Sequence, residues 1–357
     1  MRKITALLLT GILLVSLGLS GCSGSSGGLA GGGSQKLSLY NWTEYIPPEV
    51  YDLFEDETGI RVVESTFSSN EEMLAKLEAG GTEQYDLIVP SNYVINLMKE
   101  KGFIQPIDKS KIENFKNISP SVLNRDFDPD NVYSIPYMAT MTLIAVNTDK
   151  MAELGVTITS LNDLLNPALA NNLVVLDDSR ELVGAALKAT GKDVDTRDKA
   201  TIQGTLPWLK ELKKNVKTFD SDSSKTALAT NEVAAGLVYN IDAGQAIGEN
   251  SAIAVVYTTE PCEAAIDNFV ITSTAKNKEN AETFISFIHR PDIYKMILDE
   301  FPGICLNDAA KELLDSDYLD NPGGNVDAKE LSRAHFIADI GDAAAYYDEV
   351  FTQMKAE

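Results

Sequence analysis

The chain has 357 residues, a formal net charge of −23 and only two histidines. This acidity argues against nucleic acid as a partner, because nucleic-acid binding needs basic patches, and it favours cationic ligands through long-range attraction. The roughly 320 residues that follow the leader are enough for one very large domain or two ordinary ones.

The N-terminus has the pattern of an export signal. Two basic residues precede an apolar run over residues 4–19, which is too short to span a bilayer and closes on Leu-Ser-Gly-Cys. This pattern is a lipobox, so Cys22 is expected to be acylated and to become the new N-terminus. We predict a signal peptide over 1–21, a Gly/Ser tether over 22–35, and a body lipid-anchored outside the cytoplasm, in a periplasmic space or on the outer face of a plasma membrane.

The first half of the remaining chain alternates between strand and helix patterns. Alternating apolar residues predict a strand over Leu37–Tyr40, and Pro47-Pro48 predicts the start of a helix over Glu49–Glu57. The next predicted elements are a strand over 61–66, a helix capped by Asn70 and closed by Gly80-Gly81, a strand over 85–90 and a helix over 92–101. Such alternation predicts an α/β fold with a mainly parallel sheet, whose ligand loops gather at one edge.

The second half continues the alternation and begins with a long strand over 133–147. Further strands are predicted over 174–176, 218–219, 233–239, 252–256 and 269–273. Further helices are predicted over 161–165, 180–190, 206–214, 278–289, 309–314 and 342–354.

A segment that combines aromatic, hydroxyl and acidic side chains lies at the end of the first predicted strand. Residues 40–45, Tyr-Asn-Trp-Thr-Glu-Tyr, combine aromatic rings, a hydroxyl and a carboxylate just before a helix. A carboxylate among aromatic faces suits an organic cation, because the carboxylate pairs with the charge while the rings cover its methylenes. The residues alone leave open a second interpretation, in which the aromatic side chains only cap a core.

Six short segments, in order along nearly the whole mature chain, carry a more specific pattern. They are YNWTEYIPP at 40–48, YDLIVPS at 85–91, IDKSK at 107–111, YSIPY at 133–137, LDDSRE at 176–181 and AKNK at 275–278. Together they resemble the extracytoplasmic spermidine/putrescine-binding proteins of ABC import systems. The resemblance implies a type II periplasmic-binding-protein fold, with two lobes linked by several chain crossings and a ligand cleft between them. The first lobe is expected over 36–142 plus 268–307, and the second over 143–267 plus 308–357.

The resemblance also implies which side chains contact the ligand. The first-lobe positions are Trp42, Thr43, Glu44, Tyr45, Ser91 and Tyr93, and the second-lobe positions are Asp178, Glu181, Tyr239, Asp242 and Asp267. The carboxylates are expected to bind ammonium groups, the aromatic rings to enclose the methylene chain, and the hydroxyls of Thr43 and Ser91 to add hydrogen bonds. Arg180 is expected to orient a carboxylate.

Four positions depart from the family pattern. Ala265 and Ala139 stand where aromatic residues are usual, Ile304 lies in a segment that lacks an expected Tyr, and Ile337 replaces a Gln. One lost ring costs about 0.5–2 kcal/mol of cation–π attraction. Which polyamine or other solute is preferred therefore stays open.

The predicted function is the substrate-binding component of an ABC importer. It captures spermidine/putrescine-type polyamines by hinge closure and delivers them, as a monomer, to a membrane permease. The alternative is a receptor of the same fold for another amine or a neutral metabolite. An enzyme is not expected, since neither His289 nor His335 lies near a nucleophile motif, and no cofactor or metal is expected. A disulfide between Cys262 and Cys305 is left open.

Overall fold

The computed structural model describes residues 36–356, so the predicted signal peptide, the acylated Cys22 and the tether lie outside the described residues. The described residues all fall in a single compact unit. None of the helices described in 36–356 has the length and apolar character that crossing a bilayer requires.

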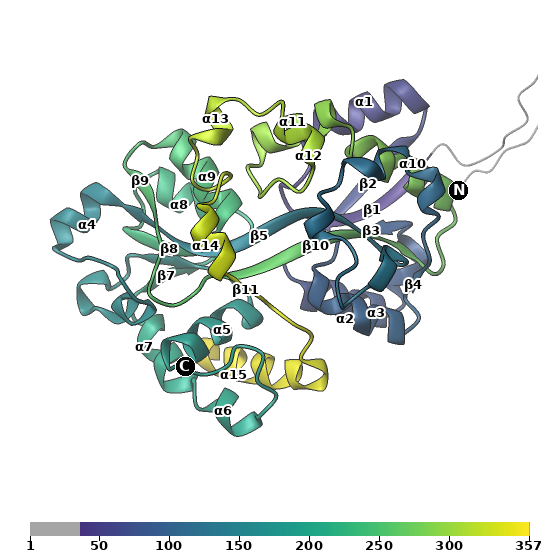
Figure 1. Cartoon of the computed structure of the whole chain (residues 1–357). Helices are drawn as coiled ribbons and strands as arrows, with labels where there is room; N and C mark the ends of the chain where they lie inside the picture. The colour runs from purple at the N-terminus through teal and green to yellow at the C-terminus, as the bar shows by residue number, and fades with distance from the viewer. Residues whose placement is uncertain (1–35, 357) are drawn as a thin grey trace, which may run out of the picture. The chain divides into compact units, whose positions relative to one another are not determined.

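The described chain is built on one mixed sheet of eleven strands (Figure 1). The strands are β1 (Lys36–Trp42), β2 (Arg61–Phe67), β3 (Leu87–Ile88), β4 (Ile104–Gln105), β5 (Ser134–Asn147), β6 (Leu173–Val175), β7 (Val216–Phe219), β8 (Ala235–Tyr239), β9 (Ile253–Val256), β10 (Glu263–Thr272) and β11 (His335–Phe336). Their order is β2-β1-β3-β10-β5-β8-β6-β7, with β4 and β11 paired to β10 and β9 paired to β5.

The expectation of a mainly parallel sheet is wrong in one respect. Parallel pairing holds within the group β2-β1-β3 and within the group β8-β6-β7. Between these groups lie the two longest strands, β5 and β10, which run antiparallel to each other and to their main neighbours. The β5–β10 pair extends from Glu263 opposite Thr142 to Val270 opposite Ser134, with a bulge between Asp267 and Asn268. The chain therefore crosses between two parallel α/β groups along this antiparallel pair.

Fifteen α-helices cover the sheet in the described chain (Figure 1). They are α1 (Pro48–Thr58), α2 (Asn70–Glu78), α3 (Asn92–Glu100), α4 (Thr148–Leu154), α5 (Ser179–Ala189), α6 (Lys199–Gln203), α7 (Leu206–Lys213), α8 (Ser224–Ala229), α9 (Asn240–Glu249), α10 (Lys278–Ile288), α11 (Pro291–Glu300), α12 (Asp308–Lys311), α13 (Ser316–Leu319), α14 (Ala328–Arg333) and α15 (Ala344–Ala356). The residue that caps α2 is Ser69 rather than Asn70, because its hydroxyl accepts the Glu72 N–H at 3.1 Å. The predicted helix over 161–165 is a short 3₁₀ turn.

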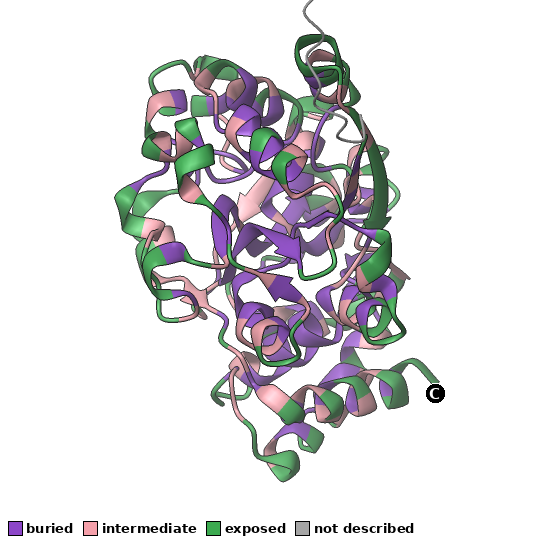
Figure 2. Ribbon diagram, turned by 90° about the vertical axis from the view of Figure 1, so that its right-hand side faces the viewer, coloured by how far each residue is buried: buried purple, intermediate pink, exposed green. Residues whose placement is uncertain are grey.

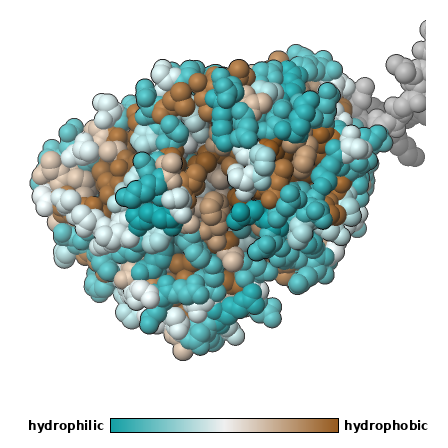
Figure 3. Space-filling view, in the orientation of Figure 1, coloured by the Kyte–Doolittle hydropathy of each residue, from teal (hydrophilic) through white to brown (hydrophobic). Residues whose placement is uncertain are grey.

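Two large hydrophobic cores lie on the two sides of the β5–β10 pair. One contains Leu37 of β1 with Phe54 and Phe284 of the helices, and the other contains Leu173 of β6 with Tyr347 of α15. The central strands and the inner helix faces are buried, while the edge strand β2 and the outer helix faces are mostly exposed (Figure 2). The face seen in Figure 3 is largely hydrophilic, with smaller apolar areas. Separate cores joined by two long strands are what a two-lobed protein requires.

One part of the expected lobe division does not match this packing. Ala310 of α12 and Tyr318 of α13 belong to the core that contains Leu37. Residues 308–319, expected in the second lobe, therefore pack with the first. The chain joins the other core further on, from Ile340 into α15.

Candidate ligand-binding site

A single cavity brings together every residue that the sequence predicted to contact ligand. It encloses about 780 Å³ of empty space, the solvent at its mouth included. The predicted residues on its lining are Trp42, Thr43, Glu44, Tyr45, Ser91, Tyr93, Asp178, Glu181, Tyr239, Asp242 and Asp267. Most of them follow the carboxyl ends of the parallel strands β1, β3, β6 and β8, where ligands of α/β sheets usually bind. Asp267 lies instead within β10.

Asp267 is the most buried carboxylate among the predicted residues, with 2% of its surface exposed. The Tyr45 hydroxyl donates to its Oδ2 at 2.6 Å, and the Ser91 hydroxyl donates to its Oδ1 at 2.6 Å. Burial raises the pKa of Asp267 to about 6, although both hydrogen bonds oppose the shift. The side chain is thus held in place by two neutral donors, and the charge of its ionised form is not compensated by them.

Asp178 and Glu181 lie at the start of α5. Asp178 caps this helix, since its Oδ1 accepts the backbone N–H groups of Arg180 at 2.8 Å and Glu181 at 3.1 Å. Burial raises the pKa of Asp178 to about 6. Burial, followed by the nearby charges of Glu263 and Asp178, raises the pKa of Glu181 well above its usual value. The two side chains make this part of the cavity strongly acidic.

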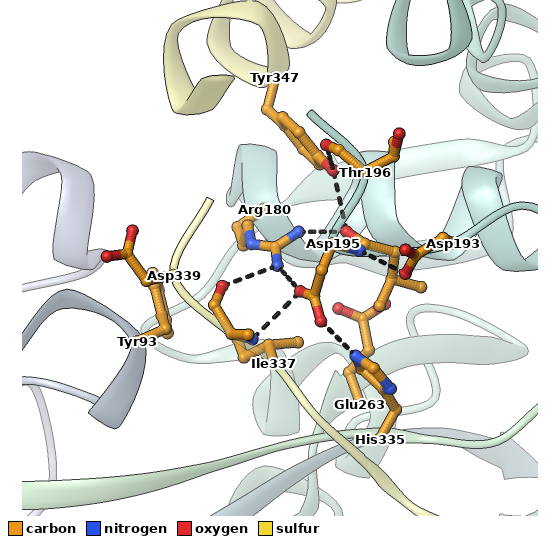
Figure 4. A network of polar contacts seen from close by, with 12 residues as sticks. Tyr93, Arg180, Asp193, Asp195, Thr196, Glu263, His335, Ile337, Asp339 and Tyr347 are labelled. Atoms are coloured by element: carbon orange, nitrogen blue, oxygen red, sulfur yellow. Dashed lines mark hydrogen bonds and ion pairs between the residues drawn. The ribbon is translucent and has the colours of Figure 1, made fainter. Parts of the chain in front are cut away.

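The side chain of Arg180 pairs with a carboxylate, but this carboxylate is not one of those on the cavity lining. Its guanidinium pairs with Asp195, donates to the Val194 carbonyl at 2.6 Å and lies 5.0 Å from the centre of the Tyr347 ring (Figure 4). Asp195 in turn accepts a hydrogen bond from the His335 ring at 2.6 Å. Arg180 contacts a cavity carboxylate through its backbone alone, since its N–H donates to Asp178.

A lysine side chain reaches the predicted acid Glu44. The Lys225 Nζ lies 2.5 Å from Glu44 Oε2 and 3.0 Å from Gln245 Oε1. Asp242 lies close by, and burial raises its pKa to about 7 against the opposing charge of Lys225. The charge of Glu44 is therefore balanced by the protein itself, whereas that of Asp267 is not.

The aromatic residues line the cavity in different ways. Trp42 packs on Phe67 with ring centres 4.5 Å apart, and the Tyr93 hydroxyl accepts a hydrogen bond from Asn70 at 2.9 Å. Burial raises the pKa of Tyr239 well above its usual value, so its hydroxyl stays neutral. These neutral rings offer apolar faces beside the carboxylates.

Sequence reasoning missed several residues of the lining. They include Phe67, Ser68, Asn70, Thr140, Thr142, Ser221, Asp222, Ile241, Gln245 and Glu263. Glu263 lies four residues before Asp267, and the period-2 alternation of a strand would have placed both on one face. The predicted strand, however, began only at residue 269.

The four departures from the family pattern divide into two pairs. Ala265 and Ile337 line the cavity. Ala139 and Ile304 pair with each other across an antiparallel bridge, in a small core with Met141 and Ile266. Only the first pair therefore alters the lining of the cavity.

The disulfide between Cys262 and Cys305 is not formed, since both residues are free cysteines. Burial raises the pKa of each thiol to about 11, which keeps it protonated and poorly reactive at neutral pH.

We expect two titratable thiols per molecule when protein that starts at Ser34 is unfolded without reductant. In the native protein both should be alkylated slowly, because the reactive thiolate is scarce at the raised pKa. A thiol assay with and without denaturant measures this. Thiols that appear only after reduction would show that the pair had been oxidised.

The fold and the cavity define a class of protein. Two α/β cores flank a cavity lined by aromatic and acidic residues, and within residues 36–356 no group of His, Cys, Asp or Glu is arranged to hold a metal ion. This architecture is that of a two-lobed solute-binding protein. The model of the family described as bacterial extracellular solute-binding protein matches residues 49–322, and the chain belongs to this family.

Individual relatives agree with this assignment. The spermidine/putrescine-binding periplasmic protein of Salmonella typhimurium is 40% identical over 320 residues, which cover 90% of this chain and 91% of the relative. A solved structure from Listeria monocytogenes, described as a spermidine/putrescine ABC transporter, is 33% identical with a TM-score of 0.85, covering 90% of this chain and 99% of that one. The TpPotD lipoprotein of Treponema pallidum is 28% identical with a TM-score of 0.79, covering 90% and 100%. The expected fold and the expectation of a binding protein rather than an enzyme are confirmed.

Proposed function

We propose that this protein is the substrate-binding component of an ABC importer and that its ligand is a polyamine of the spermidine/putrescine type. The observation that carries the proposal is the buried Asp267 carboxylate, which within residues 36–356 accepts its side-chain hydrogen bonds from two neutral hydroxyls inside an aromatic-lined cavity. A buried carboxylate needs a cation, and methylenes beside that cation need apolar faces. The relatives from Salmonella typhimurium and Listeria monocytogenes, both described as spermidine/putrescine proteins, support the same ligand class.

In this proposal the five predicted carboxylates fall into three parts of the cavity, which share the ammonium groups of the ligand among them. Asp267 and Glu181 bind the ligand directly, Asp178 supports Glu181, and Glu44 and Asp242 act at the part of the cavity near Lys225. Trp42, Tyr45, Tyr93 and Tyr239 enclose the methylenes, while Thr43 and Ser91 complete the polar contacts.

Capture occurs by closure of the two lobes over the ligand. Several contacts link the predicted first lobe to the second across the cavity, among them the ion pair of Glu44 with Lys225 and the hydrogen bond that the Ser68 hydroxyl donates to Asp222 at 3.1 Å. A ligand that bridges both lobes would add to these contacts and shift the population toward the closed form. The closed, monomeric protein would then deliver its ligand to a membrane permease, held nearby by the lipid on Cys22. The lipoprotein of Treponema pallidum supports such an anchor.

Calorimetric titration with putrescine, spermidine, spermine and a neutral diol tests the proposed ligand. One-to-one binding of an amine at micromolar concentration or tighter, without binding of the diol, is expected. No binding to any amine would overturn the proposal. It would favour the second candidate, a receptor for another solute, for which Ala265 and Ile337 on the lining are the supporting observation.

The affinity for a polyamine should rise with pH between about 5 and 7.5. The cation binds the ionised carboxylate, and the pKa of Asp267 and that of Asp178 are both raised to about 6, so at lower pH a proton must leave first. Protonation of each of these two carboxyl groups should weaken ligand binding by about tenfold when the pH falls from 7 to 5. Titrations in buffers of different ionisation enthalpy should show protons released on binding near pH 6. A pH-independent affinity would mean that neither carboxyl group meets the ligand.

A further inference from the structure

Glu263 is a buried acid at the start of β10 that no sequence pattern singled out. Only 1% of its surface is exposed, yet it lines the cavity. Its Oε1 lies 3.1 Å from the Lys188 ammonium, whereas its Oε2 is buried and has no hydrogen-bond partner within the described chain. Burying a carboxylate oxygen without a hydrogen-bond donor costs free energy, unless a donor from outside the protein binds to it.

Glu263 lies against the helix that carries Glu181. A Cβ built on Gly184 would come within 2.5 and 2.7 Å of the two carboxylate oxygens of Glu263. Gly184 lies one helical turn after Glu181, so the glycine lets the Glu263 carboxylate approach the turn on which Glu181 stands. Glu181 is itself 7% exposed, and its Oε2 is also buried without a partner in the described residues.

The charges at this place do not balance. Asp178, Glu181 and Glu263 contribute three carboxylates, and Lys188 is the ammonium that pairs with one of them. Arg180 makes no contact with these carboxyl groups, because its guanidinium is bound to Asp195 (Figure 4), although its charge and that of Glu263 attract each other at longer range. The two open oxygens are therefore placed to accept from the ammonium group of a ligand.

Glu263 and Asp267 lie apart from each other along β10. Glu263, Ala265 and Asp267 alternate on one face of β10, before the bulge, so the Cα atoms of the two acids are roughly 13 Å apart. Ala265 lies between them on the cavity lining, and its small methyl side chain leaves room that a large side chain would fill. A short diamine cannot reach both carboxylates at once, whereas a longer polyamine can.

We propose that Glu263, together with Glu181, forms a subsite for the distal ammonium group of a long polyamine, and that Glu263 selects ligands by length. This inference rests on the proposed function and adds the residue that distinguishes a triamine from a short diamine. Lys188 weakens the attraction of this subsite for the ligand, because its ammonium group already pairs with one oxygen of Glu263.

The test compares spermidine with putrescine in Glu263→Gln by calorimetry. Spermidine affinity should fall by about tenfold or more, because a buried charge pair with the ligand is lost, while putrescine affinity changes by less than about threefold. Thermal unfolding of the ligand-free variant checks its fold. A merely structural role for Glu263 would change both affinities alike.

Lys188→Met is the matched second variant and acts in the opposite direction. Removing the competing ammonium leaves more of the Glu263 charge for the ligand, so the preference for spermidine over putrescine should increase. An unchanged preference in both folded variants, with binding retained, overturns the subsite alone. If Glu263→Gln does not fold, Lys188→Met decides in the same way. Failure of the unaltered protein to bind either amine overturns the proposed function and this subsite with it.

Discussion

Asp267→Asn is expected to weaken polyamine binding by about two to three orders of magnitude, because truncating one partner of a buried, hydrogen-bonded charge pair costs roughly 2–5 kcal/mol. Asn isolates the loss of charge better than Ala, since it keeps an acceptor for one of the two hydroxyls that donate to Asp267, those of Tyr45 and Ser91. The same change should alter the stability of the ligand-free protein little. Its carboxylate is paired with no cation there, and burial has already raised its pKa to about 6.

The measurement is calorimetric titration beside thermal unfolding of the same preparations. Asp320→Asn, at the exposed C-terminal end of α13, is the matched control, because it removes the same charge far from the cavity lining. Asp320→Asn should leave affinity unchanged. An affinity equally unaffected in Asp267→Asn would remove Asp267 from the site and, with it, the main observation behind the proposed function.

Local patterns predicted the first lobe well because its elements are regular. The alternation from Leu37 to Tyr40 corresponds to β1, and the paired prolines correspond to the start of α1. Strand direction was not predictable in this way, since periodicity reports which face is buried and not which neighbour pairs with which. The antiparallel β5–β10 pair is a property of the whole chain.

Other elements were missed because their local sequence opposes them. The first half of β10, Glu-Ala-Ala-Ile-Asp-Asn, holds acids and alanines that favour strands weakly, and pairing with β5 overrides this preference. Helix α9 contains Gly244, which lowers helix propensity. Packing explains this glycine, since a Cβ there would come within 2.7 Å of Pro302.

The site was predictable where the family pattern supplied it and not elsewhere. All predicted contact residues meet on one lining, but Glu263 was missed and the partner of the Arg180 side chain was not identified. A guanidinium next to two acids in sequence suggests pairing with them. Its actual partner, Asp195, lies fifteen residues further along the chain and is brought there by tertiary folding.

Arg180→Met should lower the free energy of unfolding by about 3–5 kcal/mol, because it removes one partner of a buried ion pair and leaves the other charged. Arg180 is 2% exposed and joins three parts of the second core. It binds Asp195, donates to the carbonyl of Val194 and to that of Ala338, and lies over the Tyr347 ring of α15. Ligand affinity should change far less, since the guanidinium is not part of the cavity lining.

Arg290→Met is the matched control for this loss, measured by denaturant unfolding of both variants. Arg290 also forms ion pairs, with Glu57 and Asp292, but on the surface, where such pairs contribute about 0–1 kcal/mol. Both variants remove one positive charge from the same acidic protein, so long-range charge effects are similar and the difference between them isolates burial. Equal losses would show that the Arg180 network does not hold α5 against the chain near Ala338. A much larger loss in Arg180→Met would show that this buried network stabilises the packing of α5 against the chain near Val194 and Ala338.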